Sequence, residues 1–355
     1  MRFHPLRVRE VERLTDDAVA VTFDVPPELH DTFRHVPGQH VTLRREADGV
    51  EVRRTYSVCT PAAAAPAAPR LKVGIRLVEG GVFSTYALKE LSAGDTVEVT
   101  PPAGRFVLRP RPGRFAAVVG GSGITPVLSI AATLLAEQPE ARFHLIRSDR
   151  TAASAMFLEE VAELKDRYPD RLHLVHTLSR EERQAGLPAG RLDADRLTTL
   201  LPALLPVPDV DGWFLCGPHG LVDGAEKALY ALGVPASAVH QEVFHVDDAS
   251  AGRREQVPGR SAPGAATLTA TLGGRMGVWP AGNGETLLET VLRNRSDAPY
   301  ACRGGVCGTC RVKLVSGEVS MDRNFALEPE EVSAGYVLAC QAHPLTEAVT
   351  VDFDA

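Results

Sequence analysis

The chain has 355 residues, of which 44% are hydrophobic and 23% charged, and its formal net charge is −7 at pH 7. This length predicts two or three domains, and no apolar run approaches the roughly 18 residues that a membrane-spanning helix needs. The start of the chain is charged and has no apolar core, so we expect no signal peptide, and no basic stripe is present. The sequence therefore predicts a cytoplasmic protein that binds neither membranes nor nucleic acid.

Residues 1–110 are dominated by short runs that alternate between apolar and polar side chains. These runs are AVAVTFDV, QHVTLRRE, RRTYSVCT, RLKVGIRLV and DTVEVTPP, with proline and glycine between them. A period of two is typical of half-buried strands, and closely spaced turns favour antiparallel pairing. We expect an antiparallel β-barrel.

Residues 111–245 instead alternate between buried strands and amphipathic helices, one of which is expected over 155–168. This order predicts a Rossmann-like domain, with a parallel sheet and helices on both faces. Its first strand runs into GGSGITP at 120–126, which places backbone N–H groups at a helix N-terminus, where a diphosphate can bind. Thr125 and Pro126 depart from the GxGxxG pattern, so a nucleotide site of a different family is indicated.

A stretch rich in glycine, serine, proline and charge follows at 246–264 and is predicted to be a flexible linker. Beyond it, residues 265–355 contain two strands of a hairpin, TLTATL and RMGVWPAG, then the helix ETLLETVLRN and the strand and turn CRVKLVSGEVSM. This order of elements resembles the β-grasp ferredoxin fold.

Four of the six cysteines follow one spacing, Cys302-x4-Cys307-x2-Cys310, with Cys340 after 29 further residues. This is the plant-type pattern for a 2Fe-2S cluster, and the neighbouring Gly304, Gly305 and Gly308 let the backbone wrap around it. Zinc sites favour paired C-x2-C knuckles, and the second pair is missing here. Disulfides are the other alternative, but without a secretion signal clustered thiols are more often metal ligands.

Four motifs occur in the order found in the ferredoxin-NADP reductase superfamily: RRTYSV at 53–58, GGVFST at 80–85, GGSGITP, and CGP at 216–218. With a C-terminal ferredoxin-like part, the chain resembles the reductase components of multicomponent oxygenases. Within these it looks like the reductase subunits of phenylacetyl-CoA 1,2-epoxidase systems, through RRTYSVC, LEPEEVSAGYVLACQAHPLT and the closing VTVDFDA. The likeness spans essentially every residue.

The resemblance implies that Arg54 pairs with the FAD diphosphate, that Tyr56 lies against the isoalloxazine ring and that Ser57 reaches the flavin N5 edge. An outward arginine and a core tyrosine on an ordinary strand are the alternative. The backbone amides and hydroxyls of one loop would hold the rest of the diphosphate, unless this loop only caps the following helix. That loop comprises Gly81, Val82, Phe83, Ser84 and Thr85.

The nucleotide-binding half would supply the other side of the same site. The resemblance places Gly121, Gly123 and Thr125 against the pyridine nucleotide. Cys216, Gly217 and Pro218 would shape the nicotinamide pocket, and Glu242 and Phe244 would close the flavin site. The alternatives are a buried apolar thiol at Cys216 and a solvated glutamate beside a core phenylalanine at the other two positions. The candidate catalytic residues are Ser57, Cys216 and Glu242, whereas Cys59 is expected to be a core thiol.

Three polar residues that follow successive strands, Arg150, Ser179 and Arg180, favour NADPH because a 2′-phosphate needs basic and hydroxyl groups. Asp149 favours NADH, since an acid usually binds the ribose diol of that nucleotide. We predict NADPH.

The implied function is an electron relay from NADPH through FAD and the 2Fe-2S cluster to a di-iron oxygenase subunit. One alternative is a reductase for a Rieske-type or another aromatic-ring oxygenase, with FMN and NADH. A redox sensor that does not turn over, and a structural zinc protein, are the others.

Overall fold

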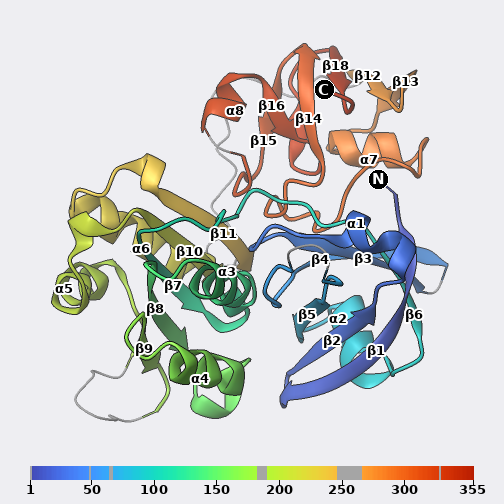
Figure 1. The fold of residues 1–355 in the computed structure, drawn as a ribbon. Helices are drawn as coiled ribbons and strands as arrows, with labels where there is room; N and C mark the ends of the chain where they lie inside the picture. Colours follow the sequence, from blue (N-terminus) through green and yellow to red (C-terminus); the bar gives the residue numbers. More distant parts are fainter. Residues whose placement is uncertain (1, 48, 64–66, 182–189, 246–265, 328) are drawn as a thin grey trace. The chain divides into compact units, whose positions relative to one another are not determined.

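The computed structural model describes residues 2–355 except 48, 64–66, 182–189, 246–265 and 328, and the chain divides into two compact units, Arg2–Ser250 and Ala251–Ala355 (Figure 1). The predicted linker at 246–264 lies outside the described residues. The finer division into a barrel over 1–110, an α/β domain over 111–245 and a ferredoxin-like part over 265–355 stays a prediction.

The first half of the N-terminal unit is a six-stranded sheet in which every pairing is antiparallel, as predicted. Its order is β4-β3-β6-β1-β2-β5. The two outer strands meet at one end, where Val58 pairs with Val73 and the Cys59 N–H donates to the Lys72 carbonyl at 2.9 Å. The strands are β1 (His4–Thr15), β2 (Ala18–Asp24), β3 (His40–Ala47), β4 (Val50–Ser57), β5 (Leu71–Arg76) and β6 (Thr96–Val99).

Inside this sheet lies an apolar core to which β1 contributes alternate residues, Leu6 and Val8, although its sequence is strongly charged. The short helix α1 (His30–Phe33) buries Phe33, and α2 (Val82–Lys89) buries Phe83 against the same core. Cys59 is also buried, at 3% exposure, in agreement with its prediction as a core thiol.

The second half of the same unit is the predicted parallel sheet, in the order β11-β10-β7-β8-β9. Right-handed crossovers in this order place α3 and α4 on one face and α5 and α6, which contact each other, on the opposite face. The strands are β7 (Arg114–Gly120), β8 (Arg142–Asp149), β9 (Leu172–Leu178), β10 (Gly212–Pro218) and β11 (Val239–His245). The helices are α3 (Ile124–Glu137), α4 (Leu158–Arg167), α5 (Ala194–Leu204) and α6 (His219–Ala231).

The prediction of a helix over 155–168 was wrong at its start, because α4 begins at Leu158. Phe157 has φ of 55°, in the left-handed region that a helix cannot include. Ala155, Met156 and Phe157 are all buried, and the Met156 carbonyl accepts a hydrogen bond from Arg147. Tertiary contacts therefore override the helical pattern of these three residues.

The C-terminal unit has a mixed sheet in the order β13-β12-β18-β14-β16, in which only β12 and β18 run parallel. The predicted hairpin and helix are confirmed, and Thr286 and Glu289 form a capping box at the start of the helix. The elements are β12 (Ala266–Leu272), β13 (Arg275–Ala281), α7 (Leu287–Leu292), β14 (Arg311–Ser316), β15 (Val319–Met321), α8 (Pro329–Ser333), β16 (Tyr336–Leu338), β17 (Ala342–Pro344) and β18 (Ala348–Asp352).

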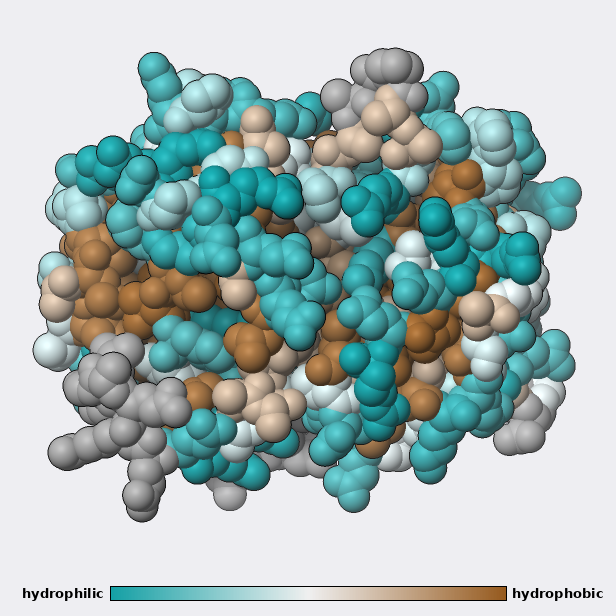
Figure 2. Space-filling model, turned by 60° about the horizontal axis from the view of Figure 1, so that its bottom comes forward, coloured by the Kyte–Doolittle hydropathy of each residue, from teal (hydrophilic) through white to brown (hydrophobic). Residues whose placement is uncertain are grey.

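Among the described residues, no helix has both the length and the apolar character needed to cross a membrane. Hydrophilic side chains cover much of the face shown in Figure 2, with apolar patches between them.

Candidate functional site

One carboxylate in the N-terminal unit, that of Glu242 on β11, lies between two side chains from the antiparallel sheet. The hydroxyl of Ser57, at the end of β4, donates to Glu242 Oε2 at 3.4 Å. His40 Nδ1, at the start of β3, lies 3.7 Å from the other carboxylate oxygen, and both side chains are largely buried. His40 and Ser57 are direct partners across β3 and β4. Sequence reasoning missed His40, whose only signal is its place just after a Pro-Gly turn.

Cys216 joins this group from β10, where it pairs in register with Glu242. It is fully buried, and burial together with the negative charge of Glu242 raises the pKa of its thiol well above the ordinary range. The thiol is therefore neutral near pH 7. The structure thus brings the three candidate catalytic residues, Ser57, Cys216 and Glu242, to one place, and Phe244 packs half-buried against the adjoining core.

The two glycine motifs of the nucleotide half pack against each other without room for side chains. A Cβ on Gly123 would lie 2.2 Å from the Cys216 carbonyl oxygen. Gly217 has φ of 143°, and its Cβ would lie 2.8 Å from the Gly120 carbonyl oxygen. Glycine is required at both positions because the opposing atoms are backbone. The turn at 121–123 therefore lies directly on the end of β10, where Pro218 is exposed.

Thr125 stabilises this turn from its buried side. Its side chain is 1% exposed, and its hydroxyl donates to the Ser122 carbonyl at 2.9 Å. Any effect of Thr125 on a nucleotide would therefore act through the shape of the turn. Pro126 is buried in the first turn of α3. Backbone N–H groups in a first turn have no acceptor within the helix, so the N–H that proline lacks costs no hydrogen bond there.

Arg54 and Tyr56, two residues apart on β4, share one face of the strand. The Tyr56 ring lies 5.7 Å from the ring of Phe83, centroid to centroid. Burial raises the pKa of Tyr56, and the nearby Arg54 charge opposes that shift only in part. Arg54 Nη1 donates to the Arg53 carbonyl at 2.7 Å, which fixes part of its guanidinium. The arginine and the tyrosine of the motif are thus neighbours.

The loop before α2 is closed by the Ser84 hydroxyl, which accepts from the Val78 N–H and lies within hydrogen-bonding distance of the Gly81 carbonyl, both at 3.1 Å. The Gly81 N–H donates back to the Val78 carbonyl at 2.8 Å. The hydroxyl is thus used within the loop, and the diphosphate role of this loop stays a prediction. The amides of Val82 and Phe83 belong to the first turn of α2 and point out of it, which suits an anion.

The three residues predicted to recognise a 2′-phosphate are brought together beyond the ends of β8 and β9. The Ser179 N–H donates to the Asp149 carbonyl and the Arg180 N–H to the Arg150 carbonyl, each at 2.9 Å. Both arginines are exposed. The two loops therefore run side by side and present two guanidinium groups and one serine.

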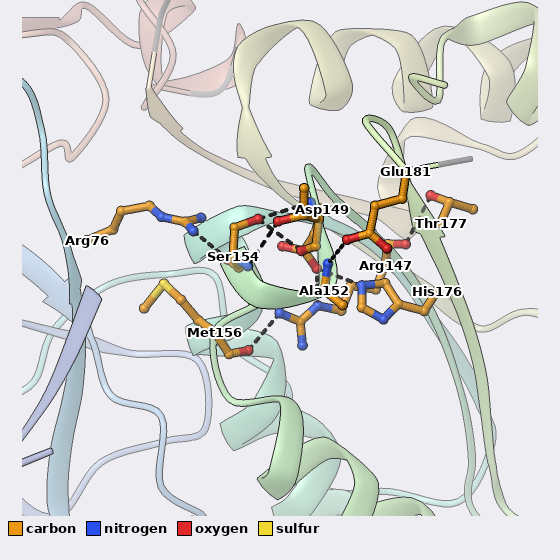
Figure 3. A network of polar contacts seen from close by, with 10 residues as sticks. Arg76, Arg147, Asp149, Ala152, Ser154, Met156, His176, Thr177 and Glu181 are labelled. Carbon is orange, nitrogen blue, oxygen red and sulfur yellow. Dashed lines mark hydrogen bonds and ion pairs between the residues drawn. The ribbon is translucent and has the colours of Figure 1, made fainter. Parts of the chain in front are cut away.

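Asp149, the residue that argued for NADH, is turned inward (Figure 3). Its carboxylate is 1% exposed and accepts hydrogen bonds from Arg147 Nε and from His176 Nε2, the latter at 2.9 Å. Burial disfavours the charged carboxylate, but the hydrogen bond from His176 and the charge of Arg147 together hold its pKa below the ordinary value. The carboxylate is therefore ionised and does not face a bound ribose.

In the C-terminal unit, the four cysteines of the motif associate in two pairs. Cys302 and Cys307 lie close enough to shift each other's pKa, as do Cys310 and Cys340, and the thiol pKa is lowered for Cys302 and Cys340 and raised for their neighbours. Over the described part of the chain, no three histidine, cysteine or acidic side chains converge on one point to hold a single metal ion. Two pairs of thiols fit a two-iron cluster better than they fit one zinc ion.

The loop around these thiols has the backbone conformations that the glycines predicted. Gly305 and Gly308 have positive φ of 78° and 65°, and Arg303 also does, at 56°. The Gly304 N–H donates to Cys302 Sγ at 3.3 Å, and the Gln341 amide lies 3.6 Å from Cys340 Sγ. Donors of this kind stabilise thiolate ligands.

Three family models match the chain and together cover most of it. They are the oxidoreductase FAD-binding domain at residues 5–108, the oxidoreductase NAD-binding domain at 118–227 and the 2Fe-2S iron-sulfur cluster binding domain at 277–345. With the two sheets and the paired thiols, these matches define an NAD(P)H-dependent oxidoreductase that uses FAD and a 2Fe-2S cluster.

Comparison with known proteins narrows this class. The chain is 42% identical to a subunit of the 1,2-phenylacetyl-CoA epoxidase of Escherichia coli, over 99% of this chain and 98% of that protein. It is 34% identical to the ferredoxin reductase component of 3-ketosteroid-9-alpha-monooxygenase from Rhodococcus rhodochrous, over 98% of this chain and 96% of that protein. The solved structure of phthalate dioxygenase reductase superimposes on this chain with a TM-score of 0.62. The match covers 99% of this chain and 98% of that one at 22% identity, which shows a shared fold. The chain belongs to the family of oxygenase reductase components that includes this phenylacetyl-CoA epoxidase protein.

Proposed function

We propose that this reductase is the electron-donating subunit of a phenylacetyl-CoA epoxidase system and that it takes its electrons from NADPH. The observation that carries the proposal is the 42% identity to the Escherichia coli epoxidase protein over nearly the whole of both chains. The electrons would leave the 2Fe-2S cluster for a di-iron oxygenase subunit, and the complex would work in the cytoplasm. Membership of an oxidoreductase family favours turnover over a role as a redox sensor.

The residues around Glu242 fit the flavin and nicotinamide end of the relay. FAD supplies the chemistry that connects a two-electron donor to a one-electron acceptor. Arg54 would pair with its diphosphate, together with the amides of Val82 and Phe83 at the start of α2. Tyr56 would pack against the ring system.

At the reacting edge, Glu242 would hold the Ser57 hydroxyl in one orientation through the 3.4 Å contact. Cys216 is neutral and fully buried, so it would offer the nicotinamide an uncharged wall. His40 Nδ1, 3.7 Å from the other Glu242 oxygen, would add a further polar group beside this edge.

The four cysteines Cys302, Cys307, Cys310 and Cys340 would hold the cluster through their thiolates. The N–H of Gly304 and the amide of Gln341 would donate to two of the sulfurs and so raise the reduction potential.

The choice of NADPH is supported by the loops beyond β8 and β9. Arg150, Ser179 and Arg180 lie together there, and the Asp149 carboxylate is withdrawn from the surface. Two exposed guanidinium groups suit a 2′-phosphate, which NADH lacks.

A second candidate keeps the relay but changes the partner to a Rieske-type or other aromatic-ring oxygenase supplied with electrons from NADH. This candidate is supported by the 34% identity to the reductase component of 3-ketosteroid-9-alpha-monooxygenase, since a relative that similar serves a different oxygenase.

The test combines the purified reductase with the purified oxygenase subunits of a phenylacetyl-CoA epoxidase and measures epoxide formed per nucleotide oxidised. The proposal expects coupled turnover with NADPH and much slower turnover with NADH. Nucleotide oxidation without epoxide would instead point to another oxygenase, and faster turnover with NADH would contradict the nucleotide assignment.

A further inference from the structure

The buried ion group beneath the nucleotide loops consists of Arg147, Asp149 and His176 (Figure 3). Arg147 and Asp149 are two residues apart on β8 and therefore share a face, and His176 is the register partner of Arg147 on β9. Arg147 and Asp149 are each 1% exposed and His176 is 21% exposed. Each side chain belongs to a strand whose following loop carries a candidate nucleotide contact.

These contacts connect the two loops to each other. Arg147 Nη2 donates to the Met156 carbonyl at 2.6 Å. Arg147 therefore binds both ends of the loop after β8, Asp149 at its start and Met156 at its far end. His176 connects Asp149 to β9, which continues into Ser179 and Arg180. Further along the loops, the Ala152 N–H donates to the Glu181 carboxylate at 2.7 Å. The positions of Arg150 and Arg180 therefore depend on the buried group.

Stability alone is a weak explanation for this arrangement. Burying an ion pair removes two charges from water, and well-packed apolar residues often do as well or better. Over the described residues, Asp149 Oδ1 and Arg147 Nη1 are also buried without a hydrogen-bond partner, so the group is not fully satisfied. Its retention calls for a role beyond packing.

The charge of Asp149 suggests that role. A carboxylate exposed at this end of β8 would suit the free ribose diol of NADH and would repel a 2′-phosphate. Here the carboxylate is kept inside and opposed by a buried guanidinium, while Arg150 and Arg180 stay exposed.

We propose that Arg147, Asp149 and His176 are positioning residues for nucleotide choice. They keep the Asp149 carboxylate away from the nucleotide and hold the two arginine-bearing loops in register for the 2′-phosphate. This inference rests on the proposed use of NADPH.

His176 offers the sharpest test because it is the least buried member of the group. His176→Leu removes the donor to Asp149, and His176→Gln keeps a donor that can take the place of Nε2. Both are made in the full-length, FAD-loaded protein. Dissociation constants for NADP⁺ and NAD⁺ are measured by titrating the oxidised protein, and ferricyanide turnover at saturating NADPH and the melting temperature are recorded alongside.

We expect His176→Leu to weaken NADP⁺ binding about tenfold, as for a lost hydrogen bond to a charged group, and NAD⁺ binding less than about twofold. Turnover at saturating NADPH stays unchanged, so the change falls on KM, and His176→Gln restores most of the lost affinity. Equal weakening of both nucleotides, or a lower melting temperature with unchanged affinities, would overturn the inference and leave a structural role.

Asp149→Asn is the stronger variant, but it leaves a buried guanidinium without its counter-charge and could prevent folding. If it folds, its NADP⁺ affinity should fall more than in His176→Leu, and an unchanged affinity would contradict the inference. Failure of the proposed function looks different, because the unmodified protein would then bind NAD⁺ more tightly than NADP⁺.

Discussion

The iron–sulfur loop and the Glu242 site hold their functional groups in opposite ways. In the loop, Cys302, Cys307 and Cys310 lie within nine positions, and only Cys340 comes from elsewhere. At the other site, Ser57 and Glu242 are 185 positions apart and meet only because β4 and β11 belong to one compact unit.

The two sites should therefore fail differently. A change in the cluster loop would remove a proposed cluster ligand and leave the flavin half intact, since the two lie in separate units. A change around Glu242 disturbs packing between segments distant in sequence, so its effects are graded. The expected effects of the variants below range from complete loss of cytochrome c reduction to a small shift in melting temperature. Each variant tests one part of the comparison between the cluster loop and the Glu242 site.

Cys307→Ser should abolish reduction of cytochrome c by NADPH while sparing reduction of ferricyanide. A serine hydroxyl is a poor substitute for a thiolate in a 2Fe-2S cluster, whereas the flavin can pass electrons to ferricyanide directly. Both activities are measured with the purified protein. Cys59→Ser is the matched control, because Cys59 is a buried thiol in the other unit and should leave cytochrome c reduction in place. Equal loss of both activities in Cys307→Ser would contradict the relay order.

Gly123→Ala should slow flavin reduction by NADPH about 100-fold, since even a 1 Å displacement of a binding turn can have this effect. The added Cβ would lie 2.2 Å from the Cys216 carbonyl oxygen, so the backbone of the turn or of β10 would have to move. Stopped-flow bleaching of the flavin band gives the rate.

Gly220→Ala provides the control for that variant. Gly220 lies in α6, and apart from its chain neighbours and the adjoining helix backbone nothing stands within 4 Å of the position that an added Cβ would take, so alanine should leave the rate unchanged. A normal rate in Gly123→Ala would show that the turn is not part of the nucleotide site.

Arg180→Ala should raise the dissociation constant for NADP⁺ by roughly 10- to 100-fold, the loss expected for a hydrogen bond to a charged group. Binding of NAD⁺ should change little. Arg142→Ala, at the opposite end of β8, is the control and should affect neither nucleotide. Equal effects on both nucleotides would refute the 2′-phosphate assignment.

Glu242→Gln should slow flavin reduction about tenfold, because the amide keeps a hydrogen bond to Ser57 but loses the charge that strengthens it. The negative charge that raises the Cys216 pKa is lost as well, so that pKa should fall. Glu226→Gln, on the surface of α6, should behave like the unmodified protein. An unchanged rate would remove Glu242 from the reacting site.

The smallest expected effect concerns pH and His144, which stacks on His173 with ring centroids 4.7 Å apart. Burial lowers the His144 pKa from 6.5 to about 4. The unfolded chain therefore binds a proton that the folded chain does not, and stability falls as the pH drops from about 6.5 towards 4.

His144→Phe keeps the stacking and removes this titration. Its loss of melting temperature between pH 7 and pH 5 should be smaller by about 2–4 °C than that of the unmodified protein. The pKa values of His35, His173 and His240 are lowered too, so part of the acid sensitivity remains. An identical loss in both proteins would contradict the assignment.

Much of the fold could be predicted because its signals are local. Alternation identified five of the six antiparallel strands, and the strand–turn–helix order identified the parallel sheet. The strand β1 did not stand out because Arg7 and Arg9 alternate with Leu6 and Val8 in a segment that looks merely charged. The start of α4 was misplaced because Phe157 is left-handed, which depends on packing around it.

The candidate site was predictable where short motifs carry it and not where tertiary contacts decide orientation. Asp149 ends a strand in the sequence, but only the buried Arg147 and His176 show that it faces inward. A histidine after a Pro-Gly turn is common in sites without any function, so only the proximity of Glu242 in the structure identifies His40 as a candidate site residue. The Ser84 hydroxyl fits a diphosphate motif in sequence and closes its own loop in the structure.

The relay itself is tested most directly by anaerobic titration of the purified, cofactor-loaded protein with NADPH, followed by absorption and low-temperature EPR spectroscopy. NADPH should bleach the flavin bands and produce the signal of a reduced 2Fe-2S cluster, and NADH should need a higher concentration for the same change. Flavin reduction with a cluster that stays oxidised, or no reduction by either nucleotide, would contradict the account.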